Sequence, residues 1–509
     1  MIFEFFHVKH VGCVRFVCAA CNNSPMNHPA TQTLLSELTT LLGCNHVLSD
    51  GDLSSWEQDW RKRCNGRALA VVRPGCTEEV AGVVRVCSRL RAQHPECGLS
   101  IVPQGGNTGL VVGSTPDESG QQIVLSLQRM NSVREVDVEN LTLTAEAGCI
   151  LQSIQDRALA LGFLFPLSLA AEGSCTIGGN LGTNAGGTQV LRFGSTRELC
   201  LGLEVVTAQG DIWHGLSGLR KDNTGYDLRN LFIGSEGTLG VITAATLKLY
   251  PLPAAQLCAW AAVPSLEAAV TLLGLARSCL GAGLTGFELM GQFALHLVDK
   301  HMTHLRVPLF RSAPFCVLLE YSDDESEEHA GHRLEHLLVL AQEQSCMTDA
   351  IVASSLTQAR QLWHVRESIP LAQAQEGQNI KHDISVPVSG VAEFVRVTDA
   401  LIEAAIPGVQ MVNFGHLGDG NLHYNVQAPA SMDAALFLRD HEDLVHRIVF
   451  DSVHAFGGSI SAEHGVGSLK TDDLTRYKSP VALHMMGAIK QALDPQNLMN
   501  PGRVVKLPR

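Results

Sequence analysis

Two short segments near the C-terminal end of the chain concentrate histidine and acidic side chains. The segment NFGHLGDGNLHYNV places His416 and His423 on either side of a Gly-Asp-Gly triplet, and ISAEHGVGSLK adds Glu463 and His464. Two residues seven positions apart on one continuous strand point to opposite faces. With Asp-Gly turning the chain between them, the two histidines can instead face each other across a hairpin. Two histidines and one carboxylate with an open position match a catalytic divalent-metal site, above all for zinc.

The residues by themselves leave a second interpretation of these segments open. The spacing is not that of a metalloprotease, because no H-E-x-x-H is present. Polar loop side chains that cap turns are therefore the favoured interpretation from the residues alone. His382 and His454, which lie nearby in the sequence, match no pattern and are interpreted as structural.

Glycine is concentrated in three clusters, each directly after a β-type run. Clustered glycines form tight turns, or they bring backbone N–H groups close to a ligand. Taken singly, each cluster is best explained as turn chemistry, but three together suggest one anionic ligand, such as a pyrophosphate, cradled by backbone amides. Neither a G-x-x-x-x-G-K-[ST] loop nor a well-placed G-x-G-x-x-G is present. The clusters are Gly105, Gly106, Gly109 and Gly113; Gly173, Gly178, Gly179, Gly182, Gly186, Gly187 and Gly194; and Gly234, Gly237 and Gly240.

Arg366 and Lys381 lie in the stretch 362–388, which is predicted to form a helix ending near Gly377 and then a strand. A planar guanidinium suits a carboxylate ligand. The chain carries 51 acidic and 37 basic residues, a net charge of −14, which disfavours nucleic acid and anionic membranes as partners. A small anionic substrate would need a locally positive pocket. From the residues alone, two surface cations are the favoured interpretation.

Length and composition limit the kind of protein that positions these residues. The 509 residues give room for roughly two to four domains, and 45% apolar residues exclude wholesale disorder. Only 17% of residues are charged, so large buried interfaces are expected. Fifteen cysteines, scattered from Cys13 to Cys346, are interpreted as small buried side chains in a reducing compartment; Cys18 and Cys21 lack the second half of a zinc or redox motif. No apolar run reaches 18 residues, so no transmembrane helix is expected.

The first half of the chain has the alternation of an α/β unit. Helical periodicity covers 31–43 and 77–93, where Thr77 is the expected cap. Residues 231–250 are predicted to form a strand and hairpin system, closed by a Pro-rich stretch at 250–253 that we take as the main domain boundary. The other predicted strands are 68–74, 99–105, 122–127, 141–147 and 200–206.

The second half repeats a strand–helix pattern through 315–343 and 391–405, which predicts an antiparallel sheet with helices on one face. Residues 434–456 and 481–493 are predicted to be helical. The predicted fold class is α+β: a two-part α/β domain, then an antiparallel-sheet domain and a helical C-terminal region. The predicted divisions are a tail at 1–26 and domains at 27–253 and 254–509. The tail carries basic residues that interrupt its apolar stretch, so a signal peptide is not expected.

Three motifs resemble one known family. PQGGNTGLVVGSTP, GSCTIGGNLGTNAGG with FGSTRELCLGLEVV, and KDNTGYDLRNLFIGSEGTLGVITAATLKLYP are similar to the flavin domain of the vanillyl-alcohol-oxidase-like flavoproteins. The nearest branch is that of the D-2-hydroxyglutarate dehydrogenases, beside D-lactate and glycolate dehydrogenases. The resemblance runs from about residue 28 to the C-terminus. It implies an FAD-binding domain of the PCMH type, followed by a substrate- and metal-binding domain of the FAD-linked oxidase C-terminal type.

The resemblance also implies how the cofactor is held. Some relatives attach FAD through a histidine in the first glycine loop, but residues 103–107 contain none, so the flavin is expected to be non-covalent. The pyrophosphate is expected against the first two glycine loops, and Ile242 near the adenine. The expected FAD-binding residues are Pro103, Gly105, Gly106, Asn107, Thr108, Gly109, Gly173, Ile177, Gly178, Gly179, Asn180, Thr183, Asn184, Gly186, Gly187, Gly237 and Ile242.

For the second half, the resemblance implies metal ligation by His416, His423 and Glu463, with zinc expected and Mn²⁺ or Co²⁺ as alternatives. It implies His464 as the general base, since a neutral imidazole can take a proton from a metal-acidified hydroxyl. The implied substrate-binding residues are Arg366, Lys381 and Asn425. One position departs from the family: where the hydroxyglutarate enzymes carry a threonine, this chain has Pro370, which removes a donor and is expected to kink the helix.

The activity implied by the resemblance is oxidation of D-2-hydroxyglutarate to 2-oxoglutarate, with hydride transfer to FAD. Because no C-x-x-C-x-x-C array is present, an external acceptor is expected, such as an electron-transfer flavoprotein, a quinone or a cytochrome. A homodimer is expected, in the cytoplasm or, in a eukaryote, in the mitochondrial matrix.

Three other functions stay open. Pro370 is the main support for D-lactate or a longer D-2-hydroxy acid as the substrate. A catalytically silent flavoprotein subunit of a larger complex would have no need of the intact histidines, Glu463 and Arg366. A zinc hydrolase would leave three glycine-rich loops without a ligand.

Overall fold

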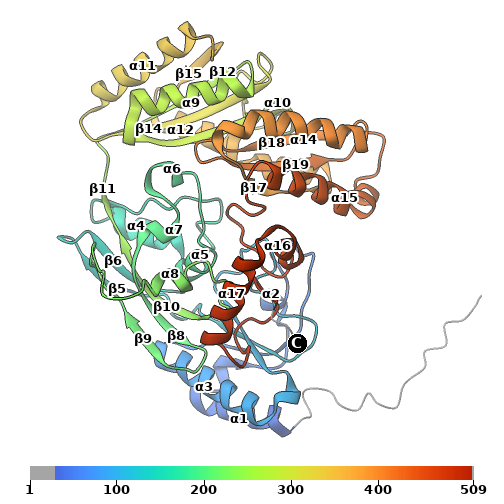
Figure 1. Ribbon diagram of the computed structural model, residues 1–509. Coiled ribbons are helices and arrows are strands. Elements are labelled where there is room, and N and C mark those ends of the chain that lie inside the picture. Colours follow the sequence, from blue (N-terminus) through green and yellow to red (C-terminus); the bar gives the residue numbers. More distant parts are fainter. Residues whose placement is uncertain (1–28, 507–509) are drawn as a thin grey trace, which may run out of the picture.

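The computed structural model describes residues 29–506 and contains two sheet systems with separate hydrophobic cores. In Figure 1 the first system, blue to green, lies below the second, yellow to orange. The chain passes from one to the other after β11 (Tyr250–Pro251). The predicted tail at 1–26, with Cys13, Cys18 and Cys21, lies outside the described residues. Among residues 29–506, no two cysteines are joined by a disulfide bond.

The first sheet is the predicted α/β unit. Strands β2 and β3 pair in parallel with β4, and β1 adds an antiparallel edge. Every residue of β2 and β4 is buried, as expected for strands covered on both faces. The elements are α1 (Pro29–Leu42), β1 (Val47–Leu48), α2 (Ser54–Glu57), β2 (Ala68–Val72), α3 (Thr77–Gln93), β3 (Ser100–Gln104) and β4 (Gln122–Ser126), with short 3-10 turns at Cys44–His46 and Pro95–Cys97.

Helix α3 has the predicted bounds, but the predicted cap is wrong. The residue before the helix is Cys76, whose side chain makes no capping hydrogen bond. Thr77 is the first helical residue, and its hydroxyl donates to Glu204 of a strand far along the chain at 2.6 Å. The Thr77 hydroxyl therefore bonds the buried carboxylate of Glu204 instead of capping the helix, as the local sequence pattern predicts.

The second sheet is antiparallel, in the order β5-β6-β10-β8-β9. The strand predicted within 231–250 is present as β10, but the predicted hairpin is wrong: α8 comes first, and β10 pairs with β6 and β8, which come from far earlier in the chain. Strand β10 is buried along almost its whole length, so its backbone needs a hydrogen-bonded strand on each edge. Residues 234–239 therefore form a loop that leads into β10 rather than the turn of a hairpin. The elements are β5 (Val133–Asp137), β6 (Thr142–Glu146), α4 (Leu151–Leu159), β7 (Phe163–Leu164), α5 (Ile177–Thr183), α6 (Val190–Phe193), α7 (Thr196–Leu199), β8 (Cys200–Thr207), β9 (Ile212–Gly215), α8 (Arg229–Phe232) and β10 (Gly240–Lys248).

The second half is built on an eight-stranded antiparallel sheet, ordered β15-β12-β14-β13-β18-β19-β16, with β17 also paired to β19. Its strands are β12 (Ala255–Val263), β13 (Leu284–Gly291), β14 (Phe315–Asp323), β15 (Asp349–Val352), β16 (Asn379–Ile380), β17 (Asp383–Ser385), β18 (Gln410–His416) and β19 (Asn421–Gln427). The predicted α+β class and antiparallel sheet are confirmed.

Helices cover both faces of this sheet, so the expectation of helices on one face is wrong. Strand β12 shows why: Ala259 and Ala261 belong to one core, while Cys258 and Trp260 belong to another on the opposite face. A strand that is apolar on both sides needs a cover on both sides. One face carries α9 (Leu266–Leu280), α11 (Glu327–Glu343), α14 (Val391–Ala405) and α15 (Ala434–Ala455); the other carries α10 (Gln292–His301), α12 (Leu356–Glu367) and α13 (Ile369–Glu376).

One helical segment, Leu266–Gly283, is long and apolar enough by composition to cross a membrane. Its residues Leu272, Leu273 and Ala276 are buried in the core beneath the sheet. That packing is typical of a core helix, and the described residues contain no clear membrane span.

The C-terminal segment returns to the first half of the molecule. Helices α15 and α17 (Pro480–Leu493) confirm the predicted helices at 434–456 and 481–493, whereas α16 (Thr471–Tyr477) was not predicted. Figure 1 shows α16 and α17, in red, beside the blue and green elements. Beyond α17, Met499 bridges to Ile101 of β3, and Leu498 lies in the first core. The stretch 457–470 therefore connects the two halves, and it carries Glu463 and His464.

Candidate active site

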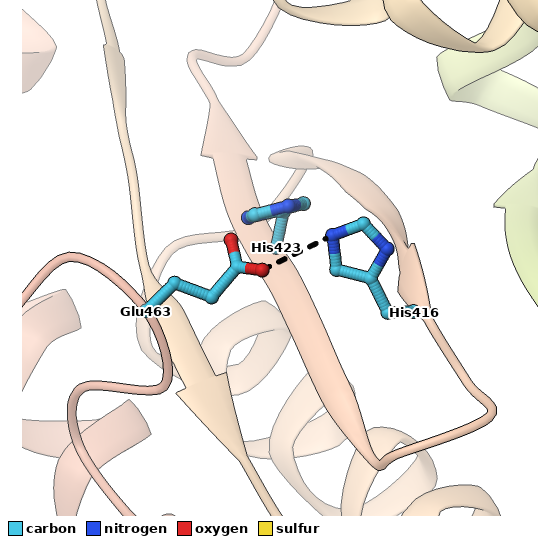
Figure 2. A group of neighbouring side chains, drawn as sticks. All are labelled: His416, His423 and Glu463. Atoms are coloured by element: carbon cyan, nitrogen blue, oxygen red, sulfur yellow. Dashed lines mark ion pairs between the residues drawn. The ribbon is translucent and has the colours of Figure 1, made fainter. Parts of the chain in front are cut away.

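The three candidate metal ligands converge on one point (Figure 2). His416 ends β18 and His423 lies on β19, so the hairpin at 417–420 brings the two rings to 5.7 Å between centroids. Glu463 reaches them from the loop after α15, with Oε1 at 3.4 Å from His416 Nε2. One ligand atom from each residue lies within 4.8 Å of the others. This is the arrangement that the hairpin hypothesis predicts.

A buried glutamate orients His416. Glu288 on β13 is completely buried, and its Oε1 lies 2.5 Å from His416 Nδ1, which leaves Nε2 facing Glu463. The other oxygen accepts from Arg366 Nε at 2.7 Å. Burial opposes a charge on Glu288, yet His416 and Arg366 lower its pKa to about 2. Such a carboxylate behind a histidine is the usual support of a metal ligand.

A second buried carboxylate fixes the loop of Glu463 and His464. Asp383 on β17 accepts from the backbone N–H groups of Glu463 at 2.9 Å and His464 at 2.8 Å. Its other oxygen accepts from Asn421 at 3.0 Å. Asp383 also lies 3.5 Å from His464 Nδ1. The two consecutive side chains therefore leave the loop in fixed directions.

The titration behaviour of the histidines differs with their surroundings. Burial lowers the pKa of His464 to about 4 and that of His423 well below its ordinary value, so both rings are neutral at pH 7. Burial also disfavours the charged form of His416, but Glu288 and Glu463 outweigh it and raise its pKa to about 9. A neutral imidazole keeps a lone pair for a metal ion or a proton. Both His423 and His464 therefore have a free lone pair at pH 7.

A third carboxylate connects this loop to the first half of the molecule. Glu236, in the third glycine cluster, has a left-handed backbone with φ 52° and accepts from the N–H groups of Val466 and Gly467, both at 2.7 Å. Burial raises the pKa of Glu236. The loop that carries His464 is therefore held between Asp383 of one half and Glu236 of the other.

The glycine clusters line a cavity, and His464 forms part of its wall. We call it the glycine-lined cavity. Of the predicted cofactor residues, these lie in its wall: Pro103, Gly105, Gly106, Asn107, Thr108, Gly109, Gly178, Gly179, Asn180, Thr183, Gly237 and Ile242. These do not: Gly173, Ile177, Asn184, Gly186 and Gly187.

The residues outside the wall have other surroundings. Ile177 is fully buried in the first core, and Asn184 closes α5 with a left-handed backbone at φ 51°. Gly186 lies against the carboxylate of Glu463, where a Cβ would approach Oε1 to 2.8 Å. Gly187 packs on the backbone of Ser168. Gly186 therefore belongs to the neighbourhood of the histidines rather than to the cavity wall.

The cavity has two features that suit a large polar cofactor. Gly109, Gly179 and Gly182 lie in its wall without a positive φ, and a Cβ there would meet no protein atom closer than 3.5 Å. Neither backbone strain nor packing therefore requires glycine at these positions. In addition, wall side chains carry buried polar atoms that lack a protein partner: Gln104 Oε1, Thr176 Oγ1 and Asn180 Oδ1. Such atoms call for a polar ligand.

The predicted substrate-binding residues differ in how many of their polar groups already have partners within the protein. Arg366 is buried, bound to Glu288 and placed over the ring of Phe414 at 5.0 Å. Asn425 donates to Gln373 at 2.9 Å and accepts from the backbone of His382 at 3.0 Å, so its amide already joins three segments. Lys381 is half-buried; burial and then the field of Arg61 lower its pKa to about 8.

The predicted kink near Pro370 is a complete break. Helix α12 ends at Glu367 and α13 begins at Ile369, which places Pro370 in the first turn of α13. A proline is compatible with that position because the first N–H groups of a helix have no partner within it. The helix is thus interrupted at Ser368, two residues after Arg366.

The supporting carboxylates Glu288, Asp383 and Glu236 were missed by the sequence analysis. Glu288 is a single charged residue in the buried strand LTGFELMG, and such an isolated carboxylate in an apolar run could have marked it. Asp383, between His382 and an apolar stretch, carries a similar but weaker signal. Glu236 follows a pattern typical of an ordinary turn, and nothing local distinguishes it.

Comparisons with known proteins agree with this geometry. The family model "FAD binding domain" matches residues 68–215, and "FAD linked oxidases, C-terminal domain" matches residues 252–504. Two solved structures share the fold: p-cresol methylhydroxylase with substrate bound, with a TM-score of 0.74 and 16% identity over 94% of this chain and 97% of that one, and 4-ethylphenol oxidase from Gulosibacter chungangensis, with a TM-score of 0.67 and 14% identity over 94% and 98%. The fold and the glycine-lined cavity define an FAD-linked oxidoreductase.

The curated relatives narrow this class. D-2-hydroxyglutarate dehydrogenases match at 38% identity from Danio rerio (92% of this chain, 85% of the relative), 36% from Arabidopsis thaliana (92% and 81%) and 38% from Xanthomonas citri (89% and 92%). The first two are named mitochondrial. The chain belongs to the family of the FAD-linked D-2-hydroxyglutarate dehydrogenases.

Proposed function

We propose that this protein oxidises D-2-hydroxyglutarate to 2-oxoglutarate with a non-covalent FAD and a divalent metal ion, zinc above all. The observation that carries the proposal is the position of His464. Its ring lies in the wall of the glycine-lined cavity, and the residue before it, Glu463, belongs to the cluster with His416 and His423. A flavin site and a candidate metal site therefore meet at one histidine.

The metal site is supported by its donor set. Two imidazoles and one carboxylate, with one histidine supported by a buried glutamate, are the ligands that a catalytic zinc ion takes. When bound, the metal ion would polarise the substrate hydroxyl, and FAD would accept the hydride. Neutral His464, held by Asp383, is suited to take the hydroxyl proton.

The proposed substrate-binding residues include two cations and one amide. Arg366, Lys381 and Asn425 are the proposed contacts, with Arg366 kept in place by Glu288. Pro370, in the first turn of α13, has neither a hydroxyl nor a backbone N–H, so this position offers the substrate no hydrogen-bond donor. That observation supports the second candidate, D-lactate or another D-2-hydroxy acid.

The remaining proposals concern partners. Electrons would leave to an external electron-transfer flavoprotein, quinone or cytochrome, and we keep the homodimer as a proposal. The mitochondrial names of eukaryotic relatives support a matrix location if this chain is eukaryotic.

The proposal is tested by following flavin absorbance anaerobically with D- and L-2-hydroxy acids, with and without a chelator. We expect D-2-hydroxyglutarate to bleach the flavin fastest, the L-isomer to have no effect, and the chelator to stop the reaction until zinc is restored. Bleaching that is equal for both isomers, or undiminished in chelated, metal-free protein, would contradict it. Acid precipitation should release all the FAD into the supernatant, since residues 103–107 hold no histidine.

A further inference from the structure

The backbone of Glu236 joins the three glycine clusters that line the cavity. Its N–H donates to the oxygen of Gly182, in the second cluster, at 2.8 Å. Its own oxygen accepts from the side-chain amide of Asn500 at 2.7 Å, and the same amide nitrogen donates to the oxygen of Gly113, in the first cluster, at 2.9 Å. Glu236 itself lies in the third cluster and in the cavity wall. A shift of this residue would therefore displace parts of the wall from all three clusters.

The side chain of Glu236 reaches from this wall to the loop that carries His464. Its two oxygens accept from two different peptide groups, the N–H of Val466 and that of Gly467, both at 2.7 Å. The glycines on either side of Val466 have left-handed backbones, with φ 82° at Gly465 and 53° at Gly467. A Cβ on Gly465 would approach Oε1 of Glu236 to 2.6 Å. The loop thus folds closely around one carboxylate, and successive backbone N–H groups in such a turn are typical of anion binding.

Asp383 holds the other end of the same loop. Of the five residues 463–467, the first two donate their backbone N–H groups to Asp383, and the last two donate theirs to Glu236. Asp383 pairs with His423 in the sheet that carries two candidate metal ligands, whereas Glu236 lies in the wall of the cavity. The backbone of His464 is therefore fixed relative to both sites at once, by one carboxylate from each.

The loop has a second link to the cavity wall, in which the N–H of Ser468 donates to the oxygen of Val111 at 3.1 Å. That link joins backbone to backbone, so a change of the Glu236 side chain leaves both of its groups in place. It lies four residues after His464, whereas Glu236 binds the loop from the second residue after it. Glu236 is therefore the nearer of these two links, and a substitution can test it.

We propose that Glu236 is a positioning residue that fixes the loop of Glu463 and His464 against the wall of the FAD site, so that the metal ion and FAD each strengthen the binding of the other. The inference rests on the proposed function for the identity of both ligands. A metal ion held by Glu463 orders the loop, the loop binds the Glu236 carboxylate, and the Glu236 backbone holds the three glycine clusters. The coupling is reciprocal, because one free energy is shared by the two binding equilibria.

The test measures FAD release from the holoprotein with and without the metal ion. Chelator-treated, desalted holoprotein is diluted with or without zinc, and released FAD is followed by its fluorescence, which requires neither turnover nor substrate. We expect zinc to slow FAD release from the unmodified protein by about fivefold, the lower end of usual coupling, without changing FAD occupancy in concentrated protein. Glu236→Gln turns an amide N–H₂ toward one of the two backbone N–H groups. We expect it to bind zinc, but zinc should slow its FAD release by less than about twofold.

Two further variants complete the comparison. Glu57→Gln is the matched control, because the Glu57 carboxylate also accepts from a backbone N–H, that of Ala68 at 2.7 Å, but within the first half of the molecule. This control should show the zinc effect of the unmodified protein. If Glu236→Gln does not retain FAD, Glu236→Asp takes its place. An aspartate tolerates the left-handed backbone of this position but is one methylene too short to reach both N–H groups.

The outcomes separate this inference from the proposed function. An equal zinc effect in Glu236→Gln and in the unmodified protein, or zinc that binds the unmodified protein without slowing FAD release, overturns the inference and leaves the proposed function standing. A Glu236 variant that no longer binds zinc also overturns it, since the residue would then belong to the metal site itself. A zinc effect lost only in zinc-binding Glu236 variants supports the inference, even if D-2-hydroxyglutarate fails to bleach the flavin. If the unmodified protein binds no zinc, the proposed metal site fails and the inference fails with it.

Discussion

The glycine-lined cavity and the histidine site around Glu463 recognise their ligands in opposite ways. Most of the cavity wall consists of glycines and uncharged side chains, with Glu236 and His464 at one side and orphaned polar atoms on Gln104 and Thr176. The histidine site consists of charged and titratable side chains, with Glu288 holding His416 and Asp383 holding the loop of Glu463 and His464. A larger side chain at a glycine should therefore impair ligand binding in the cavity, whereas the loss of a charged side chain should impair the histidine site. The predictions test this difference, from the largest expected effect to the smallest.

Removing a metal ligand should have the largest effect and should leave the cavity intact. We expect His423→Ala to lose its metal and all detectable turnover while FAD stays bound at full occupancy. His423 is a cleaner choice than His416, whose removal would also leave the buried Glu288 without its partner. Metal content by mass spectrometry and FAD by absorbance are measured on the same sample. His484→Ala on α17 is the control, and full turnover in His423→Ala would contradict the site.

Removing the proposed base should cost less than removing a ligand. We expect His464→Ala to lose about 10²–10⁴ in rate, the usual range for a general base, while keeping both metal and FAD. Single-turnover flavin reduction under anaerobic conditions measures the step directly. A variant that reduces its flavin within a factor of about three of the unmodified rate would show that His464 does not take the proton.

Replacing a supporting carboxylate by an amide of the same size tests whether its charge, rather than its shape, supports the metal site. Glu288→Gln keeps the size of the side chain but removes the charge that orients His416, so we expect metal affinity to fall by about tenfold to a hundredfold. The matched control is Glu320→Gln on β14 in the same sheet. Burial raises the pKa of Glu320, and its partners are Thr285 and Trp363 rather than the histidines. Equal metal affinity in the two variants would refute the orienting role of Glu288.

Adding volume should break the cavity without touching the histidine site. A Cβ at Gly179 meets only Thr176 Oγ1 at 3.5 Å, so a valine fits the protein but projects toward the space assigned to FAD. We expect Gly179→Val to weaken FAD binding by about tenfold or more and to leave metal content unchanged. Gly487→Ala on α17, where a Cβ meets nothing, controls for the loss of a glycine. Undiminished FAD affinity in Gly179→Val would show that FAD does not bind against this part of the cavity wall.

The smallest effect is a pH dependence confined to the charged region. The pKa of Lys381 is lowered to about 8 from its ordinary value of 10.5, so the side chain is charged below pH 8 and loses its charge as the pH rises through that value. For a dicarboxylic substrate, we expect kcat/KM to fall by up to about tenfold per pH unit above 8, and D-lactate to lack this step. Lys381→Arg, which stays charged, should abolish the fall. The same pH profile for both substrates would mean that Lys381 does not bind the second carboxylate.

Much of the fold follows from local pattern. The bounds of α3, the buried strands β2 and β4, and the C-terminal helices are close to their predicted ranges, because periodicity and hydrophobic runs are properties of neighbouring residues. The prediction failed where partners are distant. Strand β10 pairs with strands from much earlier in the chain, and the large sheet needs helices on both faces. The division at residue 253 stays a prediction, and the structure adds that the C-terminal segment packs on the first core.

Of the candidate active site, the sequence by itself singled out the histidines, Glu463, the cations and the glycine clusters, because each lies in a short motif that resembles a known family; their roles stay predictions. Only the tertiary structure decided what holds them. Glu288, Asp383 and Glu236 come from segments far away in the chain, and nothing in their local sequence identifies their partners. The physical reason is that a charge can be buried only beside the groups that satisfy it, and folding alone brings those groups together.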